Sequence, residues 1–289
     1  MKILVFGKTG QVATEIKALG AGRPDELVML GRDDADFEKP AALPAVIAAH
    51  RPDIVINAVA HTAVDKAESE PELAETINAT APGHIARACA GAGIPFIHIS
   101  TDFVFDGESD TPYKEDDAVH PLGVYGATKL AGEQAVLDAG GQSVILRTSW
   151  VFSAHGGNFV KTMLRLAESR DELNIVADQR GQPTPAAYIA DAIYTIADAL
   201  AQGGKQSGIY HFSGAGPCSW ADFAREIFRA AGKQVTVHDI PASEYPTPAK
   251  RPAFSVLDCS KIEADFGIVT TGWKPGLADV VSDLGEASN

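Results

Sequence analysis

The beginning of the chain sets the strongest limit on its fold, because a short apolar run meets a glycine turn and then a helical pattern. Residues 2–6 form the run, and Gly7, Gly10 and Ala13 follow in a GxxGxxA spacing. The two glycines let the backbone turn tightly and approach a pyrophosphate, whose charge the free amides of a helix amino terminus can meet. Glycine turns between strand and helix are common, but this position at the first βα junction predicts a dinucleotide site.

Apolar runs alternate with helical patterns through the first 150 residues. Strands are predicted at residues 27–30, 54–60, 94–99 and 143–147, and helices at residues 71–90 and from Tyr125 to about residue 139. Such alternation predicts a parallel sheet covered by helices on both faces. We therefore predict an α/β fold, a Rossmann-type doubly wound parallel sheet, with a dinucleotide-binding domain in residues 1–150.

After residue 150 the pattern is less regular. It predicts helices at residues 158–169, 187–200 and 219–231, short strands at 174–176 and 208–212, and a proline-rich loop at 241–252. The loop either covers a site or simply connects two elements, since its prolines exclude a helix or a central strand. We predict that residues 151–289 form mainly a smaller substrate-binding α/β lid, with some segments returning to the Rossmann domain.

Composition narrows the class of partner. The net charge of −14 argues against nucleic acid or an anionic membrane as the main partner. Three cysteines far apart in the sequence indicate neither a disulfide framework nor a zinc site, and no metal ligand set is predicted. No apolar run has the length of a signal peptide or a membrane span, so we expect a cytoplasmic protein.

A hydroxyl, a phenol and an ammonium are predicted to meet near the middle of the chain. Tyr125 and Lys129 lie one helical turn apart on the same face, and Ser100 and Thr101 end a buried strand. Together these groups could polarise a carbonyl and give it a proton. The spacing of Tyr125 and Lys129 alone would also suit a surface helix with an exposed lysine.

The second predicted strand ends in Gly31 and Arg32, where folds that select NAD usually carry a carboxylate for the ribose hydroxyls. A guanidinium suits a 2′-phosphate, which favours NADPH, with NADH left open as a second donor. The alternative is that Arg32 merely points to solvent. The predicted cofactor-binding residues are Gly7, Thr9, Gly10, Gln11, Val12, Arg32, Asp36, Phe37, Ala58, Val59, Ala60, Tyr125 and Lys129.

Six segments in order along nearly the whole chain resemble the dTDP-4-dehydrorhamnose reductases, a family of extended short-chain dehydrogenases. They are GKTGQV at 7–12, NAVAHTAVDKAE at 57–68, STDFVF at 100–105, YGATKLAGE at 125–133, RTSWV at 147–151 and YPTPAKRP at 245–252. The segment HTAVDKAE is much more specific than the Tyr–Lys spacing.

The resemblance implies reduction of the 4-keto group of dTDP-4-dehydro-L-rhamnose by NAD(P)H to give dTDP-L-rhamnose. It implies that Tyr125 donates the proton, that Lys129 binds the nicotinamide ribose and lowers the pKa of the phenol, and that Thr101 binds the carbonyl oxygen. The substrate-binding residues that it implies are Thr62, Val64, Thr101, Asp102, Trp150, Asn158, Lys250 and Arg251. Trp150 could equally be a core residue, and His61 is expected to be structural or to face the ribose.

The chain departs from the family pattern in two respects. Some members form magnesium-bridged dimers through glutamates; here Glu15 matches one, residues 185–188 offer no carboxylate, and Asp283 is at best the third. Bridging Mg²⁺ is therefore doubtful, and we expect a monomer or a weak homodimer. Phe103 replaces a tyrosine that many relatives carry, which removes a hydroxyl near the sugar.

Two other functions remain open. The chain could reduce another nucleotide-linked 4-keto sugar, because the catalytic trio sets the reaction and the lid sets the substrate. It could instead be a non-catalytic NADP-binding regulatory subunit, because this fold also serves that purpose and fold alone does not determine function.

Overall fold

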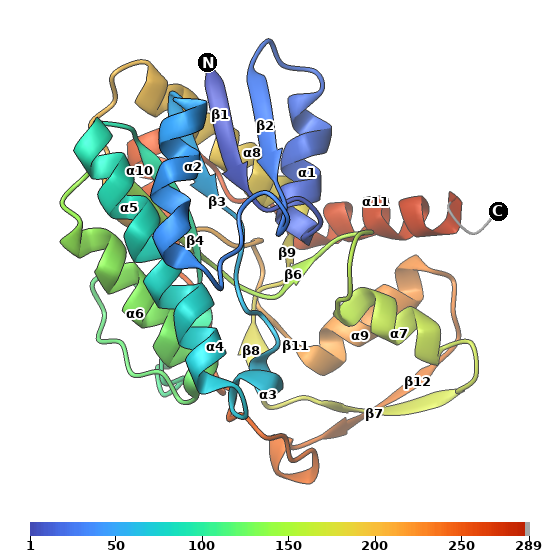
Figure 1. The fold of residues 1–289 in the computed structure, drawn as a ribbon. Helices are drawn as coiled ribbons and strands as arrows, with labels where there is room; N and C mark the ends of the chain where they lie inside the picture. Colours follow the sequence, from blue (N-terminus) through green and yellow to red (C-terminus); the bar gives the residue numbers. More distant parts are fainter. Residues whose placement is uncertain (287–289) are drawn as a thin grey trace.

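The computed structural model describes residues 1–286, which are organised around one six-stranded sheet (Figure 1). Its strands, in spatial order, are β10 (Gly208–His211), β5 (Ser143–Thr148), β4 (Phe96–Thr101), β3 (Ile54–Asn57), β1 (Lys2–Phe6) and β2 (Glu26–Leu30). All neighbouring pairs are parallel. The order changes direction between β1 and β3, and ligands of doubly wound sheets bind at such a switch point. The predicted fold class is confirmed.

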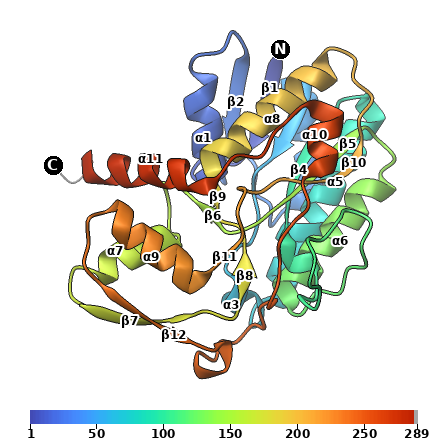
Figure 2. The same cartoon turned by 180° about the vertical axis from the view of Figure 1, so that it is seen from behind.

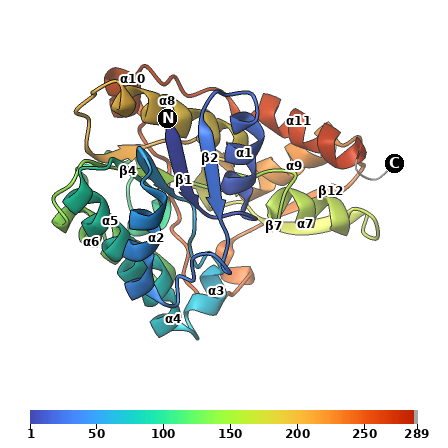
Figure 3. The same cartoon turned by 45° about the horizontal axis from the view of Figure 1, so that its top comes forward.

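Helices cover both faces of this sheet, as Figure 3 shows. One face packs against α1 (Gln11–Gly20), α8 (Ala186–Ala201) and α10 (Ser260–Phe266). The other face packs against α2 (Leu43–His50), α5 (Ala81–Ala92) and α6 (Val124–Asp138). Alternate residues of β1 point to opposite faces of the sheet. Ile3 and Val5 pack in the core on the first face, and Leu4 and Phe6 pack in the core on the second. Burial on both faces explains why β1 is a continuous apolar run.

A second, smaller layer lies beside the carboxyl ends of the strands, apart from the sheet (Figure 2). It consists of α7 (Phe159–Leu166), α9 (Trp220–Ala230), α11 (Trp273–Glu286) and the parallel pair β7 (Glu172–Val176) and β12 (Thr236–Ile240). These elements share an apolar core of their own, which includes Phe152, Phe223 and Leu277. Ser219 is the N-cap of α9 and forms a capping box with Asp222.

The remaining elements are short. They are the strands β6 (Val151–Phe152), β8 (Arg180–Gly181), β9 (Thr184–Pro185) and β11 (Cys218–Ser219), the helices α3 (Val64–Ala67) and α4 (Pro71–Glu75), and the 3₁₀ turns Pro40–Ala42, Asp102–Val104 and Ala242–Glu244. The later elements α8, β10 and α10 pack on or within the large sheet. The division into domains at residue 150 stays a prediction.

The structure corrects two details of the predicted elements. The single helix predicted at 71–90 is α4, a π-helical turn at Thr76–Thr80 and α5, with Pro82 near the start of α5. The helices α2, α10 and α11 and the strand β12 had not been predicted. Among residues 1–286 no helix combines the length and the apolar character needed to cross a membrane.

Candidate active site

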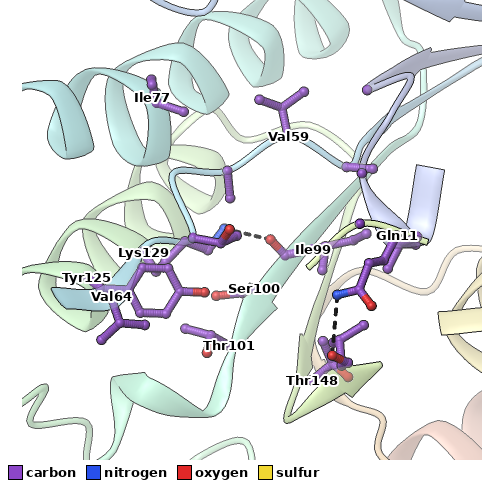
Figure 4. Close-up of a pocket in the computed structure, with 18 of the residues that line it drawn as sticks. Gln11, Val59, Val64, Ile77, Ile99, Ser100, Thr101, Tyr125, Lys129 and Thr148 are labelled. Atoms are coloured by element: carbon purple, nitrogen blue, oxygen red, sulfur yellow. Dashed lines mark hydrogen bonds between the residues drawn. The ribbon is translucent and has the colours of Figure 1, made fainter. Parts of the chain in front are cut away.

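A cleft of about 780 Å³ lies between the sheet and the smaller layer. The carboxyl ends of β1, β3, β4 and β5 form one wall, and residues after β5 and from α9 form the other. All predicted site residues except Lys250 line this cleft, although they come from widely separated parts of the sequence. Figure 4 shows several of them.

The glycine turn after β1 has a geometry that only small residues allow. Gly7 has a φ of +121°, and a Cβ there would lie 3.3 Å from both Ala13 Cβ and the Ala58 carbonyl oxygen. Gly10 caps α1 without a side-chain hydrogen bond, so the first amides of α1 are free of a side-chain cap beside the cleft. This turn therefore suits a negatively charged diphosphate.

Gln11 joins the glycine turn to the smaller layer. Its Nε2 donates to the Val151 carbonyl oxygen at 3.3 Å, and its Oε1 accepts from Asn158 Nδ2 at 2.8 Å (Figure 4 shows the first bond). Asn158 also caps α7 by accepting from the Lys161 amide. The side chain of Asn158 thus has structural partners, and its predicted contact with the substrate stays a prediction.

At the outer end of the cleft, Arg32 follows β2 and is 70% exposed. Its guanidinium forms ion pairs with Glu38 and, at 3.8 Å, with Asp36. Phe37 packs edge-on against Phe6 in the core, with the ring centroids 5.6 Å apart. Arg32 thus lines the cleft, and its contact with a 2′-phosphate, for which it would exchange Glu38, stays a prediction.

Tyr125 and Lys129 project from the first turns of α6 into the cleft. Figure 4 shows the phenol ring pointing toward Ser100 and Thr101 at the end of β4. The ammonium of Lys129, 1% exposed, donates to the Ile99 carbonyl oxygen at 2.6 Å. Lys129 is therefore not an exposed surface lysine, and that alternative is excluded.

The pKa values of this pair are moved mainly by burial. Burial raises the pKa of Tyr125 to about 12, partly opposed by the Thr101 hydroxyl. Burial also lowers the pKa of Lys129 to about 8, opposed by the charge of Glu133. Desolvation of the phenolate prevails, so the pKa of the phenol lies above its usual value, and the effect of Lys129 on it stays a prediction. Both shifts favour the neutral form of the group.

Thr101 and Asp102 lie at the end of β4 and are 5% and 2% exposed. The Thr101 hydroxyl donates to Asp102 Oδ1 at 3.1 Å and accepts from the Phe103 amide at 3.2 Å. Burial raises the pKa of Asp102 to about 6. Phe103 packs edge-on against Tyr125, with the ring centroids 5.5 Å apart, so the residue that departs from the family pattern supports the phenol.

Two aromatic rings close the cleft on the side of the smaller layer. Trp150 stacks on Trp220 with the ring centroids 3.5 Å apart and the planes 7° from parallel. Trp150 has a φ of +44°, an unusual conformation for a large residue, and both rings line the cleft. Trp150 is therefore both packed and exposed to the cleft.

The proline-rich loop meets the cleft at Arg251, which pairs with both carboxylate oxygens of Asp65 at 3.2 and 2.8 Å. The preceding residue of the loop, Lys250, does not line the cleft. Ala249 is buried and Arg251 turns toward α3, so the intervening side chain faces solvent. The structure thus places the predicted substrate residue Lys250 outside the cleft.

His61 lies beside the cleft rather than in it. Its amide donates to Asn78 Oδ1 at 2.8 Å, and its Nε2 lies 3.3 Å from Glu70 Oε2. These contacts agree with the structural role that was expected. Within residues 1–286, no three His, Cys, Asp or Glu side chains lie close enough together to hold a metal ion.

The cleft also contains residues that the sequence did not single out as site residues. They are Leu30, Gly31, Ala35, Glu38, Ile77, Ile99, Thr148, Ser149, Val151, Gly156, Gly157 and Trp220. Thr148 and Ser149 end β5 as Ser100 and Thr101 end β4, and this strand-end pattern could have identified them. Trp220 carries no such signal, because α9 reaches the cleft only through tertiary packing.

The fold, the glycine turn at the first βα junction and the buried Tyr–Lys pair beside β4 define a protein of the extended short-chain dehydrogenase/reductase class. A sequence model described as "RmlD substrate binding domain" matches residues 1–286. The chain belongs to the dTDP-4-dehydrorhamnose reductase family.

Individual relatives agree over the full length. A protein of Sinorhizobium fredii named dTDP-4-dehydrorhamnose reductase is 48% identical, with 97% of each chain covered. A crystal structure of such a reductase from Clostridium acetobutylicum is 40% identical, with a TM-score of 0.93 over 99% of this chain and all of that one. A Bacillus anthracis reductase, solved in complex with NADP, is 33% identical, with a TM-score of 0.90 over 98% of this chain and 99% of that one.

Proposed function

We propose that this protein uses NADPH to reduce the 4-keto group of dTDP-4-dehydro-L-rhamnose, giving dTDP-L-rhamnose. The observation that carries the proposal is that Tyr125, Lys129 and Thr101 share one cleft with the glycine turn after β1 and with residues of the smaller layer. The relatives named above supply the identity of the sugar. Cytoplasmic location and a monomer or weak homodimer stay predictions.

The residues of the sheet edge would hold the cofactor. The amides at the start of α1 suit its diphosphate, the backbone of Ala58, Val59 and Ala60 lines the cleft beside its ribose, and Arg32 suits its 2′-phosphate. When bound, NADPH supplies the hydride that adds to the carbonyl carbon of the substrate. Lys129 would hold the nicotinamide ribose with the N–H groups that Ile99 does not use.

The chain itself supplies the proton. Addition of hydride to carbon leaves charge on the carbonyl oxygen, and Tyr125 gives that oxygen its phenolic proton, which solvent later restores. A pKa of about 12 keeps Tyr125 protonated and able to donate at neutral pH. Thr101 would hold the carbonyl oxygen next to the phenol by turning its O–H from Asp102 Oδ1 to the substrate, which aligns the ketone for both transfers.

The smaller layer would select the sugar nucleotide. Thr62, Val64, Asp102 and Trp150 line the same cleft as Tyr125, and Arg251 is a cation of this cleft that suits a diphosphate. We propose that residues 151–289 act mainly as this substrate layer, while β10, α8 and α10 complete the Rossmann domain.

The test is the loss of absorbance of reduced nicotinamide by purified protein on dTDP-4-dehydro-L-rhamnose made in situ. NADPH and NADH are compared side by side, each with and without EDTA, which also tests the doubt about Mg²⁺. We expect turnover with NADPH, and dTDP-L-rhamnose as the product identified by mass and by its sugar NMR spectrum.

Absence of turnover despite tight binding of NADPH would contradict the proposal. Turnover of a different nucleotide-linked 4-keto sugar in the same assay would retain the reaction but replace the substrate. Turnover that is lost with EDTA and restored by Mg²⁺ would reverse the expectation of a metal-independent enzyme.

A further inference from the structure

Three buried side chains form a row beneath the cleft. Asn57 ends β3, His98 lies in the middle of β4 and Lys129 reaches down from α6. His98 Nδ1 is 3.0 Å from Asn57 Nδ2, and His98 Nε2 is 3.3 Å from Lys129 Nζ. The first two side chains are fully buried and Lys129 is 1% exposed. The row therefore connects a residue that is not part of the cleft wall to the proposed cofactor lysine.

The orientation of the Asn57 amide is determined by a backbone donor. The amide N–H of Val59 donates to Asn57 Oδ1 at 2.9 Å. A backbone N–H cannot accept a hydrogen bond, so the oxygen of Asn57 must face Val59 and its Nδ2 must face His98. Asn57 therefore donates to Nδ1 of the imidazole.

This orientation determines where His98 carries its proton. Burial and the charge of Lys129 hold the pKa of His98 well below its usual range, so the ring is neutral. A neutral imidazole has one N–H and one lone pair, and here Nδ1 uses its lone pair to accept from Asn57. The proton is therefore on Nε2, the nitrogen that faces Lys129.

An N–H pointing at an ammonium is unfavourable, whereas the same N–H can donate to the lone pair of a neutral amine. We propose that His98 is a positioning residue that lowers the proton affinity of Lys129, because Asn57 holds the imidazole proton on Nε2. The loop residue Val59, which lines the cleft, sets this arrangement through Asn57.

Other groups around Lys129 act alongside His98. Glu133 lies one turn further along α6 and favours the charged lysine, while the Ile99 carbonyl oxygen accepts one of its protons. Tyr125 lies one turn earlier on α6 and is uncharged at neutral pH. His98 is the neighbour from β4 that opposes the charge, so its removal should shift Lys129 toward the ammonium.

The role in catalysis rests on the proposed function, in which charged Lys129 holds the cofactor, but the proton positions can be measured without turnover. The first measurement is the tautomer of His98 in the intact protein, from long-range ¹H–¹⁵N correlations of its ring, assigned with His98→Gln. We expect a proton on Nε2 throughout the range in which the protein is folded. A proton on Nδ1 would overturn the proposal whatever the variants do.

The second measurement is the ionisation of Lys129, followed by its ¹³Cε shift and assigned with Lys129→Arg. In His98→Gln the carboxamide can turn its oxygen toward Lys129, so we expect this lysine to ionise about one pH unit higher than in the wild type. The alkaline limb of the kcat/KM profile should move by the same amount.

The matched control is His211→Gln, which alters a second fully buried histidine of the same sheet. His211 contacts the Tyr113 carbonyl oxygen and Arg147 rather than Lys129. We expect Lys129 to ionise in this variant as in the wild type. An unchanged Lys129 in folded His98→Gln, or an equal shift in both variants, would refute the role of His98. Absence of turnover with the expected shift would count against the proposed function alone.

Discussion

At the scale of single residues, the cleft holds groups whose environment disfavours charge. Tyr125 and Lys129 are a turn apart, and burial moves their pKa values in opposite directions, to about 12 and about 8. The cause is the same for both, since loss of water destabilises a phenolate and an ammonium alike. The pair therefore begins the reaction with the phenol protonated and the lysine close to giving up a proton.

Among the single residues of the cleft, removal of the Tyr125 hydroxyl should reduce the catalytic rate most. In Tyr125→Phe we expect kcat to fall by about 10²–10⁴-fold, the usual contribution of a general acid, while NADPH binding measured by fluorescence stays unchanged. Tyr188→Phe on α8 is the control, because Tyr188 packs against the core on the far side of the sheet. Full activity of folded Tyr125→Phe would exclude the phenol as the proton donor.

Arg32 should separate the two reduced cofactors. Arg32→Ala removes the guanidinium that suits a 2′-phosphate, so we expect the KM for NADPH to rise about tenfold and the KM for NADH to change little. We expect a modest effect for two reasons. Arg32 is largely exposed, and in the wild type it must give up its pairs with Glu38 and Asp36 in order to bind the phosphate. Lys17→Ala, on the exposed side of α1, is the control. An equal rise for both cofactors would refute this role.

Asp102 should make the protein less stable as the pH rises. Its pKa of about 6 lies above the ordinary value, so between about pH 4 and pH 6 the folded chain retains a proton that the unfolded chain has lost. Stability falls through this window and stays lower above it, by about 2–3 kcal/mol.

The variant Asp102→Asn removes this titration. We expect the free energy of unfolding to increase by about 1–3 kcal/mol near pH 7.5 and by less near pH 5, as measured by urea denaturation. The same variant should raise the KM for the sugar, because Asp102 lines the cleft next to Thr101. A gain in stability that does not depend on pH would show that ionisation of Asp102 is not the cause.

At the scale of elements, a buried ion pair holds α6 on the sheet. Glu133 on α6 accepts from Arg147 on β5 at 2.9 and 2.7 Å and from the Ser100 hydroxyl on β4 at 2.5 Å. Both charged side chains are at most 2% exposed. Because Lys129 lies one turn before Glu133, this cluster also fixes the depth at which Tyr125 and Lys129 enter the cleft.

Removing one charge of this pair should be costly. Glu133→Gln leaves the Arg147 guanidinium buried without its counter-charge, and we expect a loss of about 3–5 kcal/mol in urea denaturation. The double variant Glu133→Gln with Arg147→Met should be closer to the wild type, because no unpaired charge stays buried. If the double variant lost as much stability as the sum of both single variants, the pair would have no coupling energy.

At the scale of the whole molecule, the large sheet and the substrate side of the cleft meet through a few polar contacts. Asp65 on α3 pairs with Arg251 of the proline-rich loop, and Asp65 also accepts from the Ala249 amide at 3.2 Å. The Arg251 hydrogen bond lowers the pKa of Asp65. Since both side chains are partly exposed, the pair should add little to stability, but it sets where Arg251 lies.

Asp65→Asn should therefore affect the substrate more than the fold. We expect the KM for the sugar nucleotide to rise about three- to tenfold, the KM for NADPH to stay constant, and unfolding to change by less than about 1 kcal/mol. Asp239→Asn is the control, because Asp239 forms a similar exposed pair with Arg225 away from the cleft. An equal rise in both KM values would mean that Asp65 supports the whole cleft and not the substrate side.

The sequence alone determined the sheet, its first turn and the chemistry at the strand ends. These features follow from local physics: apolar runs of strand length, glycines where a Cβ would collide, and helical spacing that places Tyr125 and Lys129 on one face. The segments that resemble the family also predicted most of the residues that line the cleft, because each segment is contiguous and can be identified from the sequence alone.

Only the tertiary structure decided which of these groups touch and what their surroundings do to them. Lys250 and Arg251 are adjacent in sequence, yet the loop turns just Arg251 inward. Trp220 and His98 gave no signal of their own, because their roles depend on Trp150 and Lys129, which are distant in sequence. The pKa of Tyr125 lies above its usual value because of desolvation, which depends on the depth of burial and so arises from packing between distant segments and not from spacing along the chain.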